Sequence, residues 1–131
     1  MAGATMDDAA DARRARGPSW EVRRGKARAH VIVVFRGKIS EEDGVESSRA
    51  FLTTIGDDAV DLIFDVRGVE SYAGRARQAW QDALLPRRRQ VRSLSVLTRS
   101  RLTRMGASVF AMILGIECRM LDELPADLQR A

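Results

Sequence analysis

The residues best suited to binding another molecule follow two short apolar segments, residues 62–66 and 94–98. Both segments are β-prone, and such runs are typical of strands buried within a sheet. If these strands are parallel neighbours, the loops after them lie side by side at the carboxyl edge of the sheet, where open α/β sheets bind ligands. Eight residues form this predicted edge: Arg67, Glu70, Ser71, Tyr72, Arg75, Arg99, Ser100 and Arg101.

Anion binding is the chemistry that this edge could perform. A guanidinium is a planar fork of donors that matches a carboxylate or a phosphate with two hydrogen bonds. The free amides at helix N-termini also attract anions. An acidic protein surface or an anionic small molecule could therefore bind there. The competing interpretation is a solvated rim, because the chain carries 20 arginines against two lysines and uses arginine as its general surface cation.

Catalysis finds little support in the sequence. The chain contains no G-x-S-x-G motif, no paired histidines and no glycine-rich phosphate loop. Asp65 stands at a strand end with no second carboxylate nearby in sequence, so a turn-capping role is favoured over a metal site. The acids from Glu41 to Asp43 stand where a helix begins, and the helix dipole accounts for them. We therefore expect no catalytic residue, no bound metal and no cofactor.

Two further residues of chemical interest are isolated in the sequence. His30 lies near the start of an apolar segment without a partner motif, so a structural or solvent-facing role is favoured. Cys118 falls on the apolar side of an alternating segment, which favours a small core residue over a nucleophile. It is the one cysteine of the chain, so neither an intramolecular disulfide nor a cysteine-based zinc site can form.

Length and composition indicate one globular domain. The chain has 131 residues, of which 45% are hydrophobic and 31% charged. Residues 1–18 lack apolar periodicity and are expected to form a disordered tail, which leaves residues 19–131 as the domain. No segment approaches the roughly 20 apolar residues of a membrane span. The N-terminus has no apolar core of a signal peptide, so a cytoplasmic location is expected.

Charge is distributed unevenly along the chain. Residues 39–65 contain eight acids and one arginine, whereas residues 67–104 contain ten arginines and two acids. This asymmetry predicts a dipolar surface with one face suited to an anionic partner. The basic pI of about 10.2 also raises nucleic-acid binding. The chain has no helix-turn-helix or RNA-recognition signature and only 5% aromatic residues, which argues against nucleic acid as a partner.

The elements that would position the edge alternate along the chain. Residues 19–23 are predicted to form an edge strand, residues 25–28 a hairpin turn and residues 29–35 a central strand. Ser40 and Asp43 resemble a capping box that begins a helix, and Gly56 is expected to end it. A second helix over residues 75–85 places Trp80 toward the sheet. Pro86 should kink or end that helix.

A third helix is expected between Ser100 as its cap and Gly115 as its end. Helical spacing predicts that its buried face consists of Leu102, Met105, Val109, Met112 and Ile113. Residues 116–120 alternate as a last strand, and residues 121–131 are expected to add a short turn of helix before fraying. The order predicts an α/β fold with a single open mixed sheet of about five strands. An N-terminal hairpin is followed by parallel strands that crossover helices connect.

This order and several residues resemble the STAS domain, the fold of the bacterial anti-sigma-factor antagonists. The resemblance covers about residues 19–124. It rests on the hairpin of residues 20–35, the strand exit Gly37-Lys38-Ile39-Ser40, the strand 62–66 leading to Gly74, and residues 94–97 before the third helix. The run from Tyr72 through Trp80 to Thr98 is more similar still to the divergent STAS/SEC14-like branch.

The resemblance also implies a function. In the phospho-regulated members of the family, an Asp-Ser-Ser-Gly motif leads into the second helix, and a partner kinase phosphorylates its second serine. This chain has Ser71-Tyr72-Ala73-Gly74 there, so Ala73 replaces the phosphoacceptor. The resemblance therefore implies a non-enzymatic bacterial regulatory module that docks a protein partner through the edge around residues 67–77, without that switch. The alternative is a small carrier or sensor of an anionic lipid or nucleotide at the same edge. Homo-oligomerisation remains open.

Overall fold

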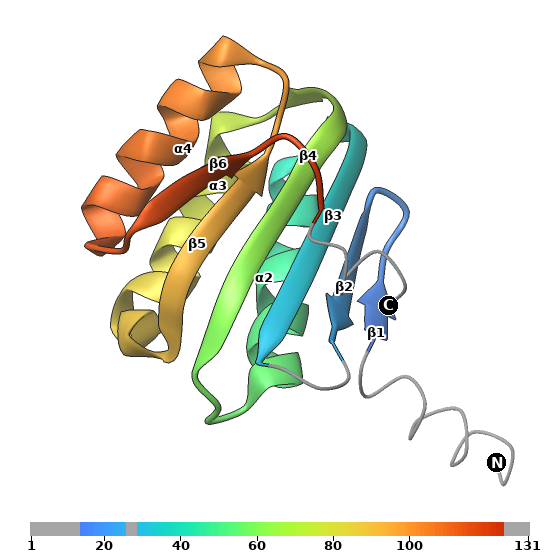
Figure 1. The fold of residues 1–131 in the computed structure, drawn as a ribbon. Helices are drawn as coiled ribbons and strands as arrows, with labels where there is room; N and C mark the ends of the chain where they lie inside the picture. The colour runs from blue at the N-terminus through green and yellow to red at the C-terminus, as the bar shows by residue number, and fades with distance from the viewer. Residues whose placement is uncertain (1–13, 26–28, 125–131) are drawn as a thin grey trace, which may run out of the picture.

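The computed structural model describes residues 14–25 and 29–124, and these build a six-stranded mixed sheet with three α-helices (Figure 1). The elements in chain order are β1 (Arg14–Arg16), β2 (Trp20–Arg24), β3 (His30–Ile39), α2 (Glu41–Ile55), β4 (Val60–Tyr72), α3 (Gly74–Leu84), the 3₁₀ helix η1 (Leu85–Gln90), β5 (Val91–Leu97), α4 (Arg101–Leu114) and β6 (Cys118–Leu121).

The strands lie in the sheet in the order in which they occur in the sequence. Strands β1, β2 and β3 pair antiparallel, and β3 to β6 pair parallel. The N-terminal hairpin sets Trp20 opposite Phe35. Each parallel pair is joined by a crossover helix, as the sequence predicts. The predicted α/β fold with one open mixed sheet is confirmed, with one strand more than expected.

The additional strand is β1, which lies within the segment predicted to be a disordered tail. Its three residues pair with β2, and Arg14 lies opposite Arg23. The Gly17 amide donates to the Trp20 carbonyl at 2.9 Å and closes the turn between the strands. A short polar strand of this kind is held by backbone hydrogen bonds, so it leaves no hydrophobic pattern in the sequence. Residues 1–13 of the predicted tail lie outside the described residues.

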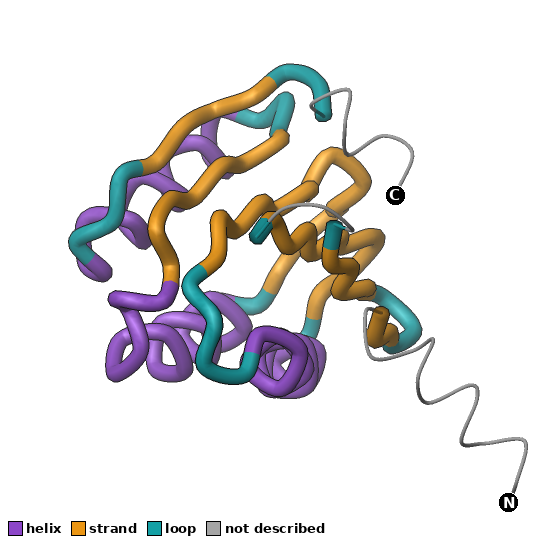
Figure 2. Tube along the Cα trace, turned by 60° about the horizontal axis from the view of Figure 1, so that its bottom comes forward, coloured by secondary structure: helices purple, strands orange, loops and turns teal. Residues whose placement is uncertain are grey.

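The three helices cover one face of the sheet, where the main core lies (Figure 2). Alternate residues of the central strands point into this core, among them Val31, Val33 and Leu62. The helices add Phe51, Trp80 and Phe110. On the opposite face a smaller cluster contains Ile32, Val34, Ile63 and Leu97, against which Leu121 and Leu124 pack. The helix-covered face therefore contains most of the apolar material.

Strands β3 and β4 extend beyond their predicted ends. The sequence predicts strands that end at residues 66 and 35, yet β4 continues to Tyr72, and β3 continues through Gly37 to Ile39. The extended ends of β3 and β4 pair with each other, so each provides the backbone hydrogen-bond partners of the other. Two register shifts accommodate the extra residues of β4. Gly37 adopts a φ of 73°, which a glycine tolerates without steric cost. The predicted breaks were wrong because mutual pairing over-rode the local turn signals.

Helix α2 begins and ends where the sequence predicts. The Ser40 hydroxyl accepts from the Asp43 amide at 3.1 Å, the Asp43 carboxylate accepts from the Ser40 amide at 2.9 Å, and Gly56 caps the end. Helices α2 and α3 approach closely at Gly44, where an added Cβ would lie 2.6 Å from the Cα of Ala76. Helix α3 ends at Leu84, and Pro86 follows in the 3₁₀ turn.

Helix α4 is oriented differently from the prediction. The five residues predicted to be buried are exposed: Leu102 (79%), Met105 (66%), Val109 (47%), Met112 (78%) and Ile113 (47%). Phe110, Ala111 and Leu114 are buried in their place. Helix α4 thus carries apolar residues on two faces, and the face with Phe110, Ala111 and Leu114 meets the sheet.

Candidate functional site

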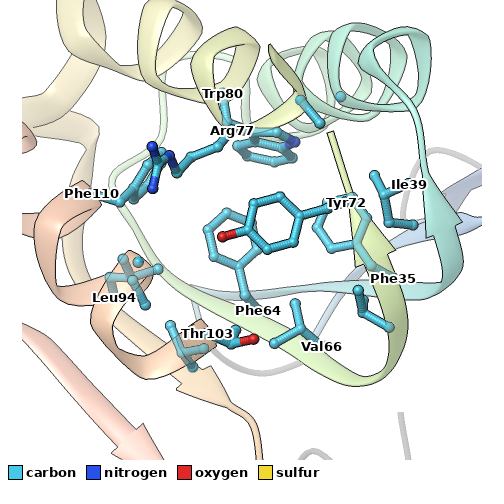
Figure 3. Close-up of a pocket in the computed structure, with 16 residues that line it drawn as sticks. Phe35, Ile39, Phe64, Val66, Tyr72, Arg77, Trp80, Leu94, Thr103 and Phe110 are labelled. Carbon is cyan, nitrogen blue, oxygen red and sulfur yellow. The ribbon is translucent and has the colours of Figure 1, made fainter. Parts of the chain in front are cut away.

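An apolar cavity of about 120 Å³ lies between the sheet and helices α3 and α4 (Figure 3). Strands β3, β4 and β5 supply Phe35, Phe64 and Leu94, while the helices supply Trp80, Ala107 and Phe110. Ala107 and Gly106 are small, so α4 does not fill the space beneath it. The cavity results from this choice of small residues on the inner face of a helix whose outer face carries large ones.

An aromatic cluster fixes the wall of the cavity formed by α3. The Trp80 ring centroid lies 4.9 Å from that of Phe64 in an edge-to-face arrangement and 5.4 Å from that of Phe51. The Trp80 Nε1 donates to the Ser47 hydroxyl at 2.9 Å. The indole is 4% exposed, and its polar atom has a partner. The predicted core position of Trp80 is confirmed, and this side chain also shapes the cavity.

Three more polar or amphipathic residues stand at the mouth of the cavity: Tyr72 at the end of β4, Arg77 on α3 and Thr103 on α4 (Figure 3). Tyr72 is 42% exposed, whereas the deep walls are buried. A Cβ added to Gly106 would lie 3.1 Å from the Tyr72 hydroxyl oxygen and 3.6 Å from Arg77 Nη1. The phenol and the guanidinium therefore share one surface of α4.

Within the predicted edge, Arg67 is engaged by its own strand. Its Nε and Nη2 donate to the two Asp65 carboxylate oxygens at 2.9 and 2.8 Å, and its amide donates to Oδ1 at 3.2 Å. Burial alone would raise the pKa of Asp65, but the hydrogen bonds and charge of Arg67 outweigh it and hold that pKa below the ordinary value. Asp65 thus accepts from the backbone amide two residues further on, the contact of the predicted capping role, and also pairs with the Arg67 guanidinium.

The remaining predicted residues divide into engaged and unengaged side chains. Arg75 lies 3.8 Å from a carboxylate oxygen of Glu41. The Ser100 hydroxyl accepts from the Thr103 amide at 3.3 Å as the cap of α4, as predicted. Glu70 and Ser71 are exposed on the extension of β4. Arg99 and Arg101 are exposed and have no hydrogen bond or ion pair within the described part of the chain.

The structure brings only part of the predicted edge together. Tyr72 meets α4 at Gly106, and Arg77 joins it there; Arg77 ends the predicted edge of residues 67–77 but is not one of its eight named residues. Arg77 stands three residues before Trp80, so helical spacing alone placed both on one face of α3. No sequence pattern marked Gly106 or Ala107, because small helical residues give no signal until the packing of the helix is known.

A serine, a histidine and an aspartate lie together on the face of the sheet that no helix covers. These residue types occur in catalytic triads, but their hydrogen bonds here differ from those of a triad. Asp61 Oδ1 accepts from the Ser93 hydroxyl at 2.7 Å, and Asp61 Oδ2 accepts from Arg92 at 3.0 Å. His30 Nε2 lies 3.6 Å from the same Oδ2. The Ser93 hydroxyl therefore donates to the Asp61 carboxylate and not to the His30 imidazole, so the three side chains do not form a serine–histidine pair. These residues form a structural ion-pair group.

The described residues show neither a cluster of metal ligands nor an activated thiol. Residues 14–25 and 29–124 contain no group of three or more His, Cys, Asp or Glu side chains that could hold a metal ion. Cys118 is half-buried and packs against the main core. Burial raises the pKa of its thiol, which keeps it protonated and poorly nucleophilic.

Comparison with solved structures places this arrangement among known folds. The chain superimposes with a TM-score of 0.65 and 11% identity on an uncharacterized protein from the DUF3478 family with a SpoIIAA-like fold, from Shewanella loihica PV-4. The match covers 86% of this chain and 91% of that one. This chain has the STAS fold. No family model and no curated protein matches the sequence.

Within the STAS fold, the segment that leads into the second helix is the end of β4 and the start of α3. Ala73 occupies the cap position of α3 and offers no side-chain hydrogen bond there. Its amide donates to the Ile39 carbonyl at 2.8 Å, which ties the segment to β3. Among the described helices, none is long and apolar enough to cross a membrane.

Proposed function

We propose that this chain is a non-enzymatic regulatory module that docks a protein partner on the surface formed by the edge around residues 67–77 and the neighbouring face of α4. The single observation that carries the proposal is the α4 outer face, defined as Leu102, Met105, Val109, Met112 and Ile113, all of which are exposed. A contiguous exposed apolar patch on a soluble domain is typical of an interaction site. Tyr72 extends this patch toward the edge, since it lies against α4 at Gly106.

Charge complementarity supports an acidic partner. Arg77, Arg99 and Arg101 are exposed and unpaired within the described residues, and the sequence of α4 contains no acid. An apolar stripe flanked by guanidinium groups complements an amphipathic helix whose apolar face is bordered by Asp or Glu. We therefore expect the partner to present such a segment. A second copy of this chain fits less well, because its α4 contains no acid that could pair with these arginines.

The alternative of a carrier for an anionic lipid or nucleotide has less support. A cavity of about 120 Å³ is too small to enclose a long acyl chain, and its apolar walls offer no set of donors for the phosphates of a nucleotide. We also propose that the partner is not released by phosphorylation at the STAS phosphoacceptor position, because Ala73 has no hydroxyl. Stoichiometric phosphate on Ser71 or Tyr72 that releases the partner would contradict this part.

A site-specific crosslink tests the docking surface. A photo-crosslinking residue at position 105 is introduced in the native cell, and the crosslinked peptide is sequenced. We expect an amphipathic segment with acidic flanks, and a synthetic peptide of that sequence should bind the purified protein. Substitution of Leu102 and Met112 with Glu should abolish peptide binding.

The matched control for this experiment is Leu85, a large apolar residue that is 41% exposed in the 3₁₀ turn after α3. A crosslinker at position 85 should not capture the same segment, and Leu85→Glu should leave peptide binding unchanged. Capture of a second copy of the chain, capture of lipid, or unchanged binding in the Leu102 and Met112 variant would reject the proposal.

A further inference from the structure

The cavity beneath α4 has walls and a mouth of different chemistry. The walls consist of aromatic and aliphatic side chains, of which Trp80 and Leu94 are buried. The mouth carries Arg77, Tyr72 and Thr103. The side chain of Arg77 makes no hydrogen bond or ion pair with any described residue. An apolar chamber closed by one unpaired guanidinium suits a ligand with an apolar body and an anionic head.

The size of the cavity limits the apolar body. A cavity of 150 Å³ lined by aliphatic and aromatic residues binds benzene in another protein, a general case that gives the scale. At about 120 Å³, this cavity accommodates about one aromatic ring or a short alkyl segment, and its open mouth leaves room for the head outside the walls.

The charge at the mouth limits the head. One guanidinium supplies one positive charge and two parallel N–H donors, which match a planar carboxylate. The Tyr72 hydroxyl lies beside Gly106 of α4, as the Arg77 guanidinium does, and can donate a further hydrogen bond. A dianionic phosphate would need a second cation, and among the described residues no cation other than Arg77 lines the cavity. The observations thus favour a monocarboxylate.

We propose that this cavity binds a small monocarboxylate with an apolar body of about one aromatic ring. Its ring occupies the space between Trp80, Phe64 and Phe110, and its carboxylate is held by Arg77 and Tyr72. The site shares Tyr72 and Arg77 with the docking surface, whereas its apolar walls lie on the inner side of α4, away from the α4 outer face. A bound ring would replace empty space beneath α4 and steady that helix against the sheet.

The test uses phenylacetate as the probe and phenylacetamide as its neutral match of the same size. Titration calorimetry on the full chain should show phenylacetate binding with one-to-one stoichiometry and the amide binding at least about tenfold more weakly. Cross-relaxation between the phenyl protons and the Trp80 indole protons should place the ligand in the cavity without any substitution. Phenyl phosphate should bind more weakly than phenylacetate.

Two variants separate the roles of mouth and walls. Arg77→Gln should weaken phenylacetate by about tenfold and leave phenylacetamide unchanged. The matched control Arg49→Gln, an exposed unpaired arginine among the described residues of α2, should change neither. Ala107→Phe should fill the cavity and remove binding of both probes. Circular dichroism reports whether that variant folds, and if it does not, the Trp80 cross-relaxation in the wild type decides the location.

Three results would overturn the proposal. One is the absence of binding by either probe at millimolar concentration. Another is equal affinity for the acid and the amide, with no effect of Arg77→Gln. The third is tighter binding of phenyl phosphate than of phenylacetate. Loss of partner docking in the α4 outer-face variants with phenylacetate binding intact would show that the two sites fail separately.

Discussion

At the scale of single residues, Trp80 connects three parts of the molecule. Its indole N–H reaches Ser47 on α2, its ring meets Phe64 on β4, and one edge forms part of the cavity wall. A buried indole loses free energy if its N–H is left without an acceptor. The buried hydroxyl of Ser47 supplies that acceptor, so the two residues fix the spacing of α2 and α3.

The Asp65–Arg67 pair gives a residue-scale prediction about pH. The pKa of Asp65 lies below its ordinary value of 3.8 in the folded protein, because hydrogen bonds from Arg67 outweigh the effect of burial. A lowered carboxyl pKa adds stability that is fully present above the unfolded-state value and is lost as the pH falls through the folded-state value. Arg67→Gln should therefore reduce the free energy of unfolding by about 1 kcal/mol at neutral pH, as expected of a partly exposed pair.

The reduction should shrink as the pH falls through the lowered folded-state pKa of Asp65, because below that pKa the carboxyl is protonated in both proteins. Urea unfolding at several pH values measures the difference, and nuclear magnetic resonance titration of Asp65 should show a higher pKa in the variant. Asp57→Asn is the matched control, because Asp57 is exposed and has no partner among the described residues. A pH-independent difference would assign the effect of Arg67 to packing rather than to the ion pair.

At the scale of elements, α4 shows the limit of sequence-based prediction. The spacing of Leu102, Met105 and Val109 predicts a buried face, and the spacing of Ala107, Phe110 and Leu114 is equally helical. The first set was predicted to be buried because it belongs to a stripe of large apolar residues, whereas the second contains the small Ala107. The sheet beneath already presents Phe64 and Leu94, so the face with small residues is the one that fits there. Periodicity located the helix, and only tertiary packing decided its rotation.

The two faces of α4 should respond differently to truncation. Phe110→Ala removes a buried ring that packs near Phe64 at a centroid distance of 6.1 Å, and it should lower the free energy of unfolding by about 3 kcal/mol. Leu102→Ala removes a side chain that is 79% exposed and should change it by less than about 0.5 kcal/mol. Thermal and urea unfolding measure both. Equal losses would show that Leu102 is buried in solution.

The other elements follow the same rule about what a sequence can reveal. The capping box at Ser40, the end at Gly56 and the break at Pro86 depend on neighbouring residues, and all three are confirmed. The extension of β4 to Tyr72 and the strand at Arg14–Arg16 depend on backbone pairing with distant residues. Local chemistry is visible in the sequence, whereas pairing across the sheet is not.

At the scale of the whole molecule, the charge asymmetry of the chain is reduced by pairing in the fold. Arg67 pairs with Asp65, Arg75 approaches Glu41, and Arg92 pairs with Asp61, so basic and acidic segments partly neutralise one another. At the proposed docking surface, Arg77, Arg99 and Arg101 are left without a partner among the described residues. The fold therefore pairs part of the charge that the sequence separates, and the dipolar surface stays a prediction.

This remaining charge should govern the rate of partner binding. Replacing Arg99 and Arg101 with Glu reverses charge at exposed positions and should slow association strongly, because complementary charges steer encounter. The melting temperature should stay nearly constant, since neither side chain has a partner in the described residues and an acid at position 101 suits the first turn of α4. Association of the wild type should also weaken from low to physiological salt, where screening acts over about 8 Å.

The matched control replaces Arg49 and Arg89 with Glu, which gives the same change in net charge away from α4. Stopped-flow association with the crosslinked peptide segment provides the measurement. For the Arg99 and Arg101 variant we expect slow association that salt no longer slows further, and for the control near wild-type behaviour. If both variants slow equally, net charge alone steers the partner, and the arginines at the start of α4 have no special place in docking. If neither slows, docking depends on the apolar outer face of α4 without electrostatic steering.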